Sequence, residues 1–279
     1  MARDTIIGFC RFSYVGRSDW RSLRGIDEIT TEHLDKIAAD LLTPQRMARR
    51  FASFEHLTLA SIKAQTDPDF RFVVVTTNRL PPHMRARLEA LCAPVPQVEL
   101  IYSDAPGLSQ VLRPVLVRER EKTEGHVVQF RLDDDDALPV RYIENLRRHA
   151  ARFADQDRFA ISFNRGVMMA LQPGRPPQPL AFHLPFLGAA CAFCDHRRYK
   201  MIYEVGHFAL GRKMLNLQDV ENPGAFIMRW ESDSVQMNLD KLPPYVEALR
   251  SGPFREKLRA DYPYMQDFRF ISLLHPPAL

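Results

Sequence analysis

The chain has 279 residues, enough for one large or two small domains and for a core that needs no disulfide or metal to hold it. Hydrophobic residues make up 46% and charged residues 26%, which excludes a collagen-like fibre and a wholly disordered chain. The net charge of +4 is too small to indicate a nucleic-acid-binding protein, for which a clustered basic stripe is expected.

The beginning of the chain and the cysteines predict a cytoplasmic location. The apolar run 6–10 is interrupted by Arg11 and is too short for a signal peptide. No run of about 18 apolar residues that would span a membrane is present. The four cysteines are irregularly spaced, and the single C-x-x-C of Cys191 and Cys194 lacks the second pair that a zinc site needs. We therefore expect buried free thiols.

Apolar, β-prone runs alternate with helical patterns over the first 165 residues. Strands are predicted at 6–12, 72–76, 98–102, 127–132 and 159–164. Helices are predicted from Thr43 and Pro44, which are typical of a helix start, to about residue 66, and at 82–91, 108–122 and 140–153. Strands that alternate with helices predict an α/β fold with a mostly parallel sheet and helices on both faces.

The alternation stops after Asn164, where Asn164, Arg165 and Gly166 predict a tight turn. The proline-rich segment 172–185 predicts a loop or lid, and a helix is expected near 244–250. We place a soft boundary at residue 165. It divides one compact body into the halves 1–165 and 166–279, of which the second is smaller and mixed in structure.

The strongest chemical signal is the run of four aspartates from Asp133 to Asp136, directly after the strand 127–132. In open parallel sheets, ligands bind outside the carboxyl ends of the strands. Adjacent carboxylates repel one another, and a hard divalent cation such as Mg²⁺ or Mn²⁺ would offset that repulsion. If the strand continues in phase, Asp133 and Asp135 point the same way and form a D-x-D pair. Asp134 and Asp136 would then support this pair, or one would join through water.

Other interpretations of the aspartates fit less well. A solvated acidic loop or a helix N-cap remains open, although a cap needs only one Asp. The D-D-x-x-D motif of terpenoid synthases lies on a helix, whereas a strand precedes the run here. Haloacid-dehalogenase phosphatases carry D-x-D after their first strand, not their fourth. A calcium loop would need Gly at position 138, which is Leu.

With these residues in view, the chain resembles the GT-A class of glycosyltransferases, and more closely the bacterial family named Putative rhamnosyl transferase. The resemblance rests on FCRFSY at 9–14, QTDPDFRFVVVTT at 65–77 and VVQFRLDDDDAL at 127–138, and it extends over most of the chain. It implies a GT-A-like fold and metal-dependent transfer of a sugar, rhamnose by the family name, from a nucleotide-diphosphate donor. Residues 1–165 would bind the donor, and residues 166–279 would form the acceptor side.

The resemblance extends to candidate donor and metal contacts. A metal held by Asp133 and Asp135, with Asp136 and a late histidine, His207, as further ligands, would neutralise the leaving diphosphate. Donor contacts are expected from residues at strand ends and from one helix: Arg11, Thr76, Thr77, Asn78, Arg113, Arg131, Asp134 and Asn164. Among them, arginines suit phosphate, and the residues at 76–78 correspond to the region that binds the base or ribose in GT-A proteins.

An inverting transfer needs a carboxylate that takes the proton of the acceptor hydroxyl. We favour Asp233 over Asp219 for this role. Trp230, in the segment WESDS at 230–234, could line an acceptor pocket. This segment lacks the histidine expected there in the GT-A class, which leaves the metal shell open. The acceptor would be a saccharide or a lipid-linked saccharide, and contact with a membrane surface through such an acceptor stays open.

Two other functions use the same residues. A metal-dependent phosphohydrolase would release inorganic phosphate from simple phosphate esters with the same aspartates. A non-catalytic nucleotide-binding module would bind a donor and turn over none.

Overall fold

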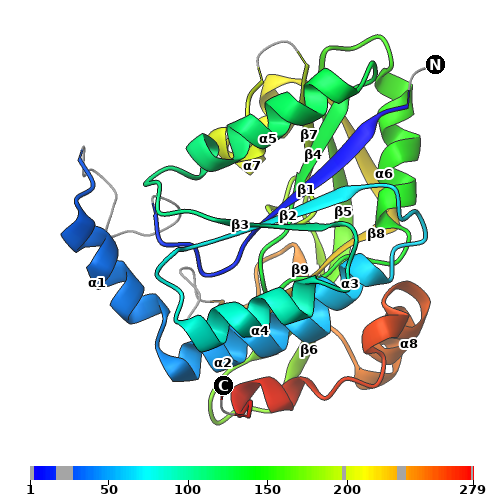
Figure 1. Ribbon diagram of the computed structural model, residues 1–279. Coiled ribbons are helices and arrows are strands. Elements are labelled where there is room, and N and C mark those ends of the chain that lie inside the picture. The colour runs from blue at the N-terminus through cyan, green and yellow to red at the C-terminus, as the bar shows by residue number, and fades with distance from the viewer. Residues whose placement is uncertain (1–2, 17–27, 197–198, 231–236, 278) are drawn as a thin grey trace.

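The computed structural model describes residues 3–16, 28–196, 199–230, 237–277 and 279. Within these residues, nine strands form one sheet in the order β3-β2-β1-β4-β7-β5-β6-β9, and β8 pairs with β5 (Figure 1). The strands are β1 (Thr5–Arg11), β2 (Arg71–Thr76), β3 (Val98–Tyr102), β4 (Val127–Arg131), β5 (Arg158–Leu171), β6 (Gln178–His183), β7 (Ala192–Asp195), β8 (Leu215–Trp230) and β9 (Val246–Ala248).

The first four strands are parallel. β1 pairs with β2 on one side and with β4 on the other, and β2 pairs with β3. The apolar runs of β1, β2 and β4 are buried on both faces, which is typical of parallel strands covered by helices, whereas β3, at the edge of the sheet, is half-buried. Because parallel strands end at the same edge of a sheet, Arg11, Thr76 and Arg131 lie along one edge.

Helices cover both faces of the parallel strands. The helices are α1 (Thr31–Leu41), α2 (Pro44–Ser53), α3 (Ala60–Lys63), α4 (Pro82–Cys92), α5 (Leu108–Lys122), α6 (Tyr142–Ala150), α7 (His207–Lys213) and α8 (Ser251–Asp261). Apolar residues of α2, α4 and α6 pack in one core cluster, and those of α5 and α7 pack in a second one. The predicted α/β fold with a mostly parallel core sheet and helices on both faces is confirmed.

The predicted helix that begins with Thr43 and Pro44 is confirmed, and it contains an irregularity. Pro44 is the first residue of α2, where its missing N–H costs nothing. A π-helical turn, Phe54–Leu59, follows and leads directly into α3. The five-residue step between the buried Leu57 and Ile62 fits this wider turn. Such turns occur mostly as local bulges and frequently at functional sites.

Three predictions for the second half are wrong. The expected turn at Asn164 is instead the middle of β5, a 14-residue strand, whose pairing with β8 shifts register between Phe163 and Val167. The proline-rich segment 172–185 contains β6. The helix expected near 244–250 is β9 followed by α8, which begins only at Ser251.

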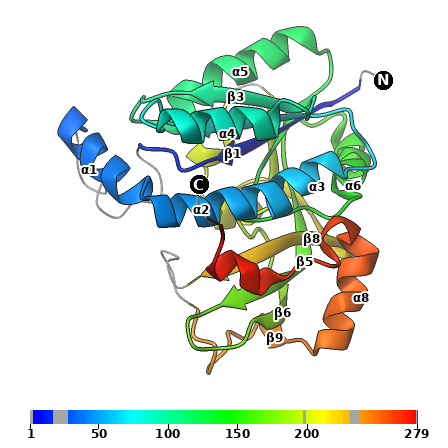
Figure 2. The ribbon, with the colours of Figure 1, turned by 60° about the horizontal axis from the view of Figure 1, so that its bottom comes forward.

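The short strand β7 joins the parallel strands to the rest of the sheet. It pairs antiparallel with β4 and with the first residues of β5, while β6 pairs with a later stretch of β5 and β8 runs parallel to β5. Figure 2 shows α8 near β5, β6 and β9 at the end of the molecule remote from α5. The boundary proposed at residue 165 falls inside β5, so the two halves share a strand.

Candidate functional site

The four aspartates form a turn directly after β4. The Asp136 N–H donates a hydrogen bond to the Asp133 carbonyl oxygen over 3.2 Å, which closes a β-turn. The extended phase expected after Leu132 is therefore wrong, because side chains in a turn do not alternate between two faces. Asp133 and Asp135 contact different groups, and Asp135 shares a partner with Asp134 instead.

Asp133 lies between two arginines at the carboxyl edge of the sheet. Arg11, the last residue of β1, donates from Nη2 to Asp133 Oδ1 over 3.1 Å. Arg131, the last residue of β4, places Nη2 3.5 Å from Asp133 Oδ2. Burial tends to raise the pKa of Asp133, but Arg11 and Arg131 outweigh it and hold this pKa below its usual range. The Asp133 side chain is 34% exposed, so an ionised carboxylate faces the outside between two cations.

The ring of Tyr203 lies beside both arginines. Its centroid is 5.3 Å from Arg11 Cζ and 5.2 Å from Arg131 Cζ, within the range of cation–π contacts. The Tyr203 hydroxyl donates to the Phe9 carbonyl oxygen over 3.1 Å, which fixes the ring against β1. Sequence reasoning missed Tyr203, because 194 positions separate it from Phe9 and no motif surrounds it.

Arg50 of α2 neutralises the next two aspartates. Its Nη1 donates to Asp134 Oδ1 over 2.9 Å and to Asp135 Oδ2 over 2.5 Å. Asp134 Oδ2 also accepts the Ser13 N–H over 3.2 Å. Burial still raises the pKa of Asp134 above its ordinary value, despite Arg50. Both carboxylates are bonded to the protein and nearly closed to solvent, with side chains 8% and 11% exposed.

Trp230 and Met228, at the end of β8, also bind carboxylate oxygens of the turn, and Trp230 shares one of them with Arg50. Trp230 Nε1 donates to Asp135 Oδ2 over 2.9 Å, and the Met228 N–H donates to Asp136 Oδ1 over 3.2 Å. Burial, with Asp135 and Asp133 nearby, raises the pKa of Asp136 well above its ordinary value. Trp230 is buried and therefore anchors the turn.

The backbone of the turn is held from the helix side. Thr58, in the π-helical turn, shares its hydroxyl between the carbonyl oxygens of Asp136 at 2.8 Å and Asp133 at 3.3 Å. Ser53 Oγ donates to the Asp134 carbonyl oxygen over 3.3 Å. The aspartate turn is thus fixed by α2, the π-helical turn and β8, and it presents Asp133 to the outside.

The predicted donor residues at the end of β2 bind a different carboxylate. Thr77 Oγ1 donates to Asp104 Oδ1 over 2.7 Å, and the Asn78 N–H donates to the same oxygen over 3.0 Å. Thr76 is fully buried in β2. These residues lie at the same sheet edge as Asp133, and their contact with a donor stays a prediction.

Two other predicted donor residues have partners elsewhere. Arg113, on the exposed side of α5, donates from Nη1 to the Tyr199 carbonyl oxygen over 3.1 Å and pairs with Glu204. Asn164 is buried within β5, where it accepts from Ser162 Oγ over 2.8 Å and donates to Gln218 Oε1 over 3.2 Å. Neither side chain contacts the aspartate turn in the described part of the chain.

Asp219, one of the two candidate bases, lies in a hydrogen-bond network within β8. Its Oδ1 accepts the N–H groups of Glu221 and Asn222, each over 2.8 Å. Its Oδ2 lies 2.6 Å from His149 Nε2. Asp219 pairs with Phe163, six residues before the partner of Met228, which puts it roughly 20 Å along the strand from the aspartate turn. Asp233, the favoured base, lies outside the described residues.

His207 comes close to the arginines through Gly188. A methyl group at Gly188 would lie 3.5 Å from Arg131 Cζ and Nη2 and 3.6 Å from His207 Cδ2. His207 Nδ1 lies 2.6 Å from the Phe186 carbonyl oxygen. When a histidine donates one N–H to a carbonyl, its other ring nitrogen carries the lone pair. His207 and Arg131 therefore both lie beside Gly188.

The carboxylates do not gather around one point. Among the described residues, no group of three or more His, Cys, Asp or Glu side chains could hold a metal ion. In the same part of the chain, no helix has the length and apolar character to cross a membrane.

The chain aligns with solved structures at low identity. Residues 1–349 of S. aureus TarS align with a TM-score of 0.39 and 10% identity, over 80% of this chain and 60% of that one. The same TarS fragment in complex with UDP-GlcNAc gives 0.38 and 11%, over 83% and 60%. A 4-diphosphocytidyl-2C-methyl-D-erythritol synthase gives 0.38 and 13%, over 78% and 90%. The chain thus spans only part of the TarS proteins that it matches.

The sequence comparisons give the family. No curated protein matches the chain. The model of the family described as Putative rhamnosyl transferase matches residues 5–240, which include the parallel strands, the aspartate turn and all of β8. The chain therefore belongs to the Putative rhamnosyl transferase family.

Proposed function

We propose that this glycosyltransferase moves a sugar, rhamnose by the family description, from a nucleotide-diphosphate donor to a saccharide or lipid-linked acceptor. The diphosphate would lie at the carboxyl edge of the sheet, against Arg11 and Arg131. Mg²⁺ or Mn²⁺ would be the cofactor, bound at Asp133.

The observation that carries this proposal is the exposed carboxylate of Asp133 between two arginines. Arg11 and Arg131 come from the ends of the adjacent parallel strands β1 and β4, where open α/β sheets bind their ligands. Arginines form charge-assisted, bidentate bonds to phosphate oxygens, and a carboxylate among them can share a divalent cation with the same phosphate. Two arginines beside one aspartate therefore suit a diphosphate with a bound metal ion better than they suit a carboxylate ligand alone or a cation alone.

The residues fit a metal at one carboxylate. Asp134, Asp135 and Asp136 are buried, and each has at least one carboxylate oxygen bound by Arg50, Trp230 or a backbone N–H group, so Asp133 is the aspartate that faces outward. Mg²⁺ is commonly held by one or two carboxylates together with substrate phosphates and water. When bound, such an ion supplies charge neutralisation to the departing diphosphate.

The remaining steps belong to the side chains of this chain. Arg11 and Arg131 would orient the diphosphate, and Tyr203 keeps both guanidinium groups in place. His207, which lies beside Gly188 as Arg131 does, is proposed as a further metal ligand. Asp233 is proposed as the base that takes the acceptor proton, because both carboxylate oxygens of Asp219 are hydrogen-bonded, to the N–H groups of Glu221 and Asn222 and to His149.

Thermal unfolding with nucleoside diphosphates tests the proposal. A ligand that binds the native state raises the melting midpoint by mass action, and we expect at least one nucleoside diphosphate to do so more strongly with Mn²⁺ than without it. Asp133→Ala should remove the Mn²⁺-dependent part of this rise. It should also reduce sugar transfer by about 100-fold or more, since metal neutralisation is worth several kcal/mol in such reactions.

Asp240→Ala is the matched control, because Asp240 pairs with an arginine, Arg175, at the surface. It should leave both the midpoint rise and the turnover as in the unmodified chain. Donor binding by Asp133→Ala with unchanged Mn²⁺ dependence would refute the proposed metal site.

A further inference from the structure

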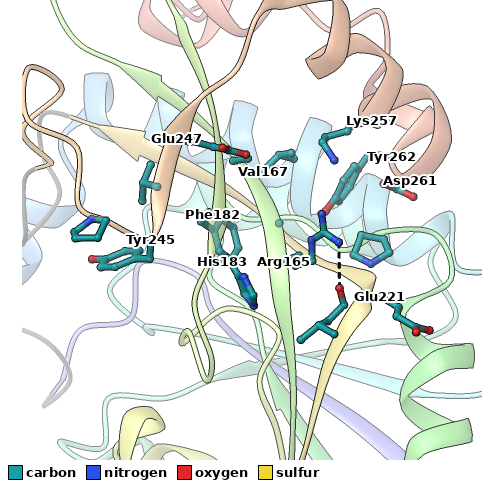
Figure 3. Close-up of a pocket in the computed structure, with 16 residues that line it drawn as sticks. Arg165, Val167, Phe182, His183, Glu221, Tyr245, Glu247, Lys257, Asp261 and Tyr262 are labelled. Carbon is teal, nitrogen blue, oxygen red and sulfur yellow. Dashed lines mark hydrogen bonds between the residues drawn. The ribbon is translucent and has the colours of Figure 1, made fainter.

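A cavity in the second half of the molecule shares no lining residue with the site around Asp133. Its volume is about 630 Å³, within the roughly 300–1,000 Å³ of small-molecule sites. Figure 3 shows Lys257 and Asp261 of α8 on one side and Tyr245 and Glu247, at β9, on the other, with Arg165 of β5 between them. Five elements, β5, β6, β8, β9 and α8, thus contribute residues to one hollow.

The charges in the cavity are nearly balanced. Arg165 and Lys257 face three carboxylates, those of Glu221, Glu247 and Asp261. Within the described residues, no ion pair involves any of these five side chains, and Arg165 donates from Nη1 only to the Val220 carbonyl oxygen over 3.2 Å. An anion such as a phosphate would meet an excess of carboxylates, and a cation would meet Arg165 and Lys257.

A neutral polyhydroxyl ligand can use both kinds of group. Hydroxyls donate to carboxylates and accept from guanidinium and ammonium groups, so a saccharide can bind to both kinds of charged group in the lining. The cavity also offers aromatic surface, since Tyr245 is 41% exposed and Phe182 lies in its wall. Sugar rings present apolar C–H faces beside their hydroxyls, and a tyrosine likewise combines an apolar ring with a polar tip.

The cavity lies near the aspartate turn without being part of it. Val167 in its wall pairs with Phe226 of β8, and Phe226 pairs in turn with Ala137, the residue after the turn. Two strand spacings amount to about 10 Å. A ligand that occupied both the cavity and the space beside Asp133 would therefore have to be longer than one sugar unit.

We propose that this cavity binds an uncharged segment of a saccharide acceptor, remote from the sugar unit that receives the transferred group. The inference depends on the proposed function only in naming the saccharide as the acceptor. Binding of the saccharide needs neither donor nor transfer, so the two proposals fail separately.

The test is an NMR-monitored titration of the full chain with two neutral trisaccharides, rhamnotriose and mannotriose. We expect one of them to bind in the millimolar range, and Tyr245→Ser and Lys257→Met each to weaken it by at least tenfold. Glu256→Gln, an exposed position on α8 that does not line the cavity, is the matched control and should bind as the unmodified chain does. Asp133→Ala should also retain trisaccharide binding.

The other outcomes contradict either the cavity proposal or the proposed function. No binding of either trisaccharide up to about 10 mM, or equal binding by Tyr245→Ser and Lys257→Met, would overturn it. If inorganic phosphate or UDP binds to the unmodified chain and this binding is lost in Lys257→Met, the proposal of an uncharged ligand is wrong. Trisaccharide binding without any Mn²⁺-dependent donor binding would refute the proposed function and leave the cavity assignment standing.

Discussion

At the scale of single residues, Asp133 differs from the three aspartates that follow it in what its oxygens contact. Asp133 meets two arginines at the sheet edge, whereas Asp134 and Asp135 share Arg50 in the interior. Four identical side chains thus divide into one that faces outward and three that are buried and fix a turn. The difference comes from the turn, which sends successive side chains in different directions.

Arg50→Met tests this division. Removal of one partner from a buried ion pair leaves the other charge uncompensated, and Arg50 is the guanidinium partner of both Asp134 and Asp135. We expect the free energy of unfolding to fall by about 3 kcal/mol, measured by urea titration. Arg141→Met, which removes an exposed i,i+3 pair with Glu144, should leave it nearly unchanged, because exposed ion pairs contribute little to stability.

A second substitution in the Arg50→Met chain tests whether the loss of stability comes from the carboxylates that Arg50 binds. Asp135→Asn removes one of the two uncompensated charges and should recover part of the lost stability. If Arg50→Met alone is as stable as the unmodified chain, the buried carboxylates do not depend on Arg50.

Asp219→Asn tests whether the carboxylate in the β8 network stabilises the fold. Burial tends to raise the pKa of Asp219, but hydrogen bonds from Asn222, His149 and Glu221 prevail and lower it. A carboxyl whose pKa is lower in the folded than in the unfolded chain stabilises the fold above the unfolded pKa, about 3.9. That stabilisation disappears as the pH falls toward the folded pKa.

Asp219→Asn should therefore lower the melting midpoint at neutral pH and flatten its decline between about pH 5 and pH 3. Asn222→Ala removes one donor and keeps the carboxylate, so it should lower the midpoint while part of the decline remains. Parallel midpoint curves for Asp219→Asn and the unmodified chain would contradict the role given to this carboxylate.

The local sequence indicated the aspartates, Arg11 and Arg131, but not Arg50 or Tyr203. A run of carboxylates after a buried strand is visible in the sequence alone. The contacts of Arg50 join positions 84 and 85 residues apart, and nothing near Arg50 marks it. The strand-phase argument failed because one backbone hydrogen bond, from Asp136 to Asp133, ends the extended conformation.

At the scale of elements, β1 depends on a glycine at its centre. A methyl group at Gly8 would lie 2.2 Å from Phe130 Cζ and 2.7 Å from Phe72 Cδ2, and these rings belong to the neighbouring strands β4 and β2. The two phenylalanines, with centroids 6.2 Å apart, pack over the backbone of β1 in the space that the absent side chain leaves.

Gly8→Ala should accordingly destabilise the protein. Overpacking of a filled core costs about 1–3 kcal/mol, and we expect about 3 kcal/mol by urea titration, because both rings are held within the sheet. Gly252→Ala in the first turn of α8, where a methyl group meets no atom within 4 Å, should be neutral or add up to about 1 kcal/mol. Equal stability of Gly8→Ala and the unmodified chain would show that the rings can shift aside.

The elements of the first half were predictable, and those of the second half were not. Continuous apolar runs and proline-started helices carry their own local signal, as in β2 and α2. In β5, by contrast, Asn164 and Gly166 suggest a turn, but they accompany a register shift inside a long strand, where glycine often marks a bulge. Tertiary pairing with β6 and β8 overrides the local preference there.

At the scale of the whole molecule, one sheet passes through both proposed halves. β7 lies between β4 and β5, so residues far along the chain complete the edge of the parallel strands. A chain that ends at residue 165 would lose β7 and half of β5. Its remaining segment of β5 would have no partner strand, and the edge of β4 would be open.

We therefore expect a protein of residues 1–165 to show no cooperative thermal unfolding, followed by circular dichroism. The full chain should unfold in one main transition, since β5 contributes to both halves. A fragment 1–165 that is monomeric and melts cooperatively would mean that the donor-binding half is an independent domain.

The π-helical turn at Phe54–Leu59 lets the helix hold one extra residue without moving two anchors of the aspartate turn apart. Arg50 and Thr58 both bind this turn, yet eight residues of uninterrupted α-helix would point them about 80° apart. One extra residue, absorbed by the wider turn, takes up about 100° and brings them to within about 20° of a common direction. Deletion of a single residue between them would leave seven residues of regular α-helix and the same common direction, so a chain shortened by one residue here should keep both anchors, whereas an α-helix of the present length would not.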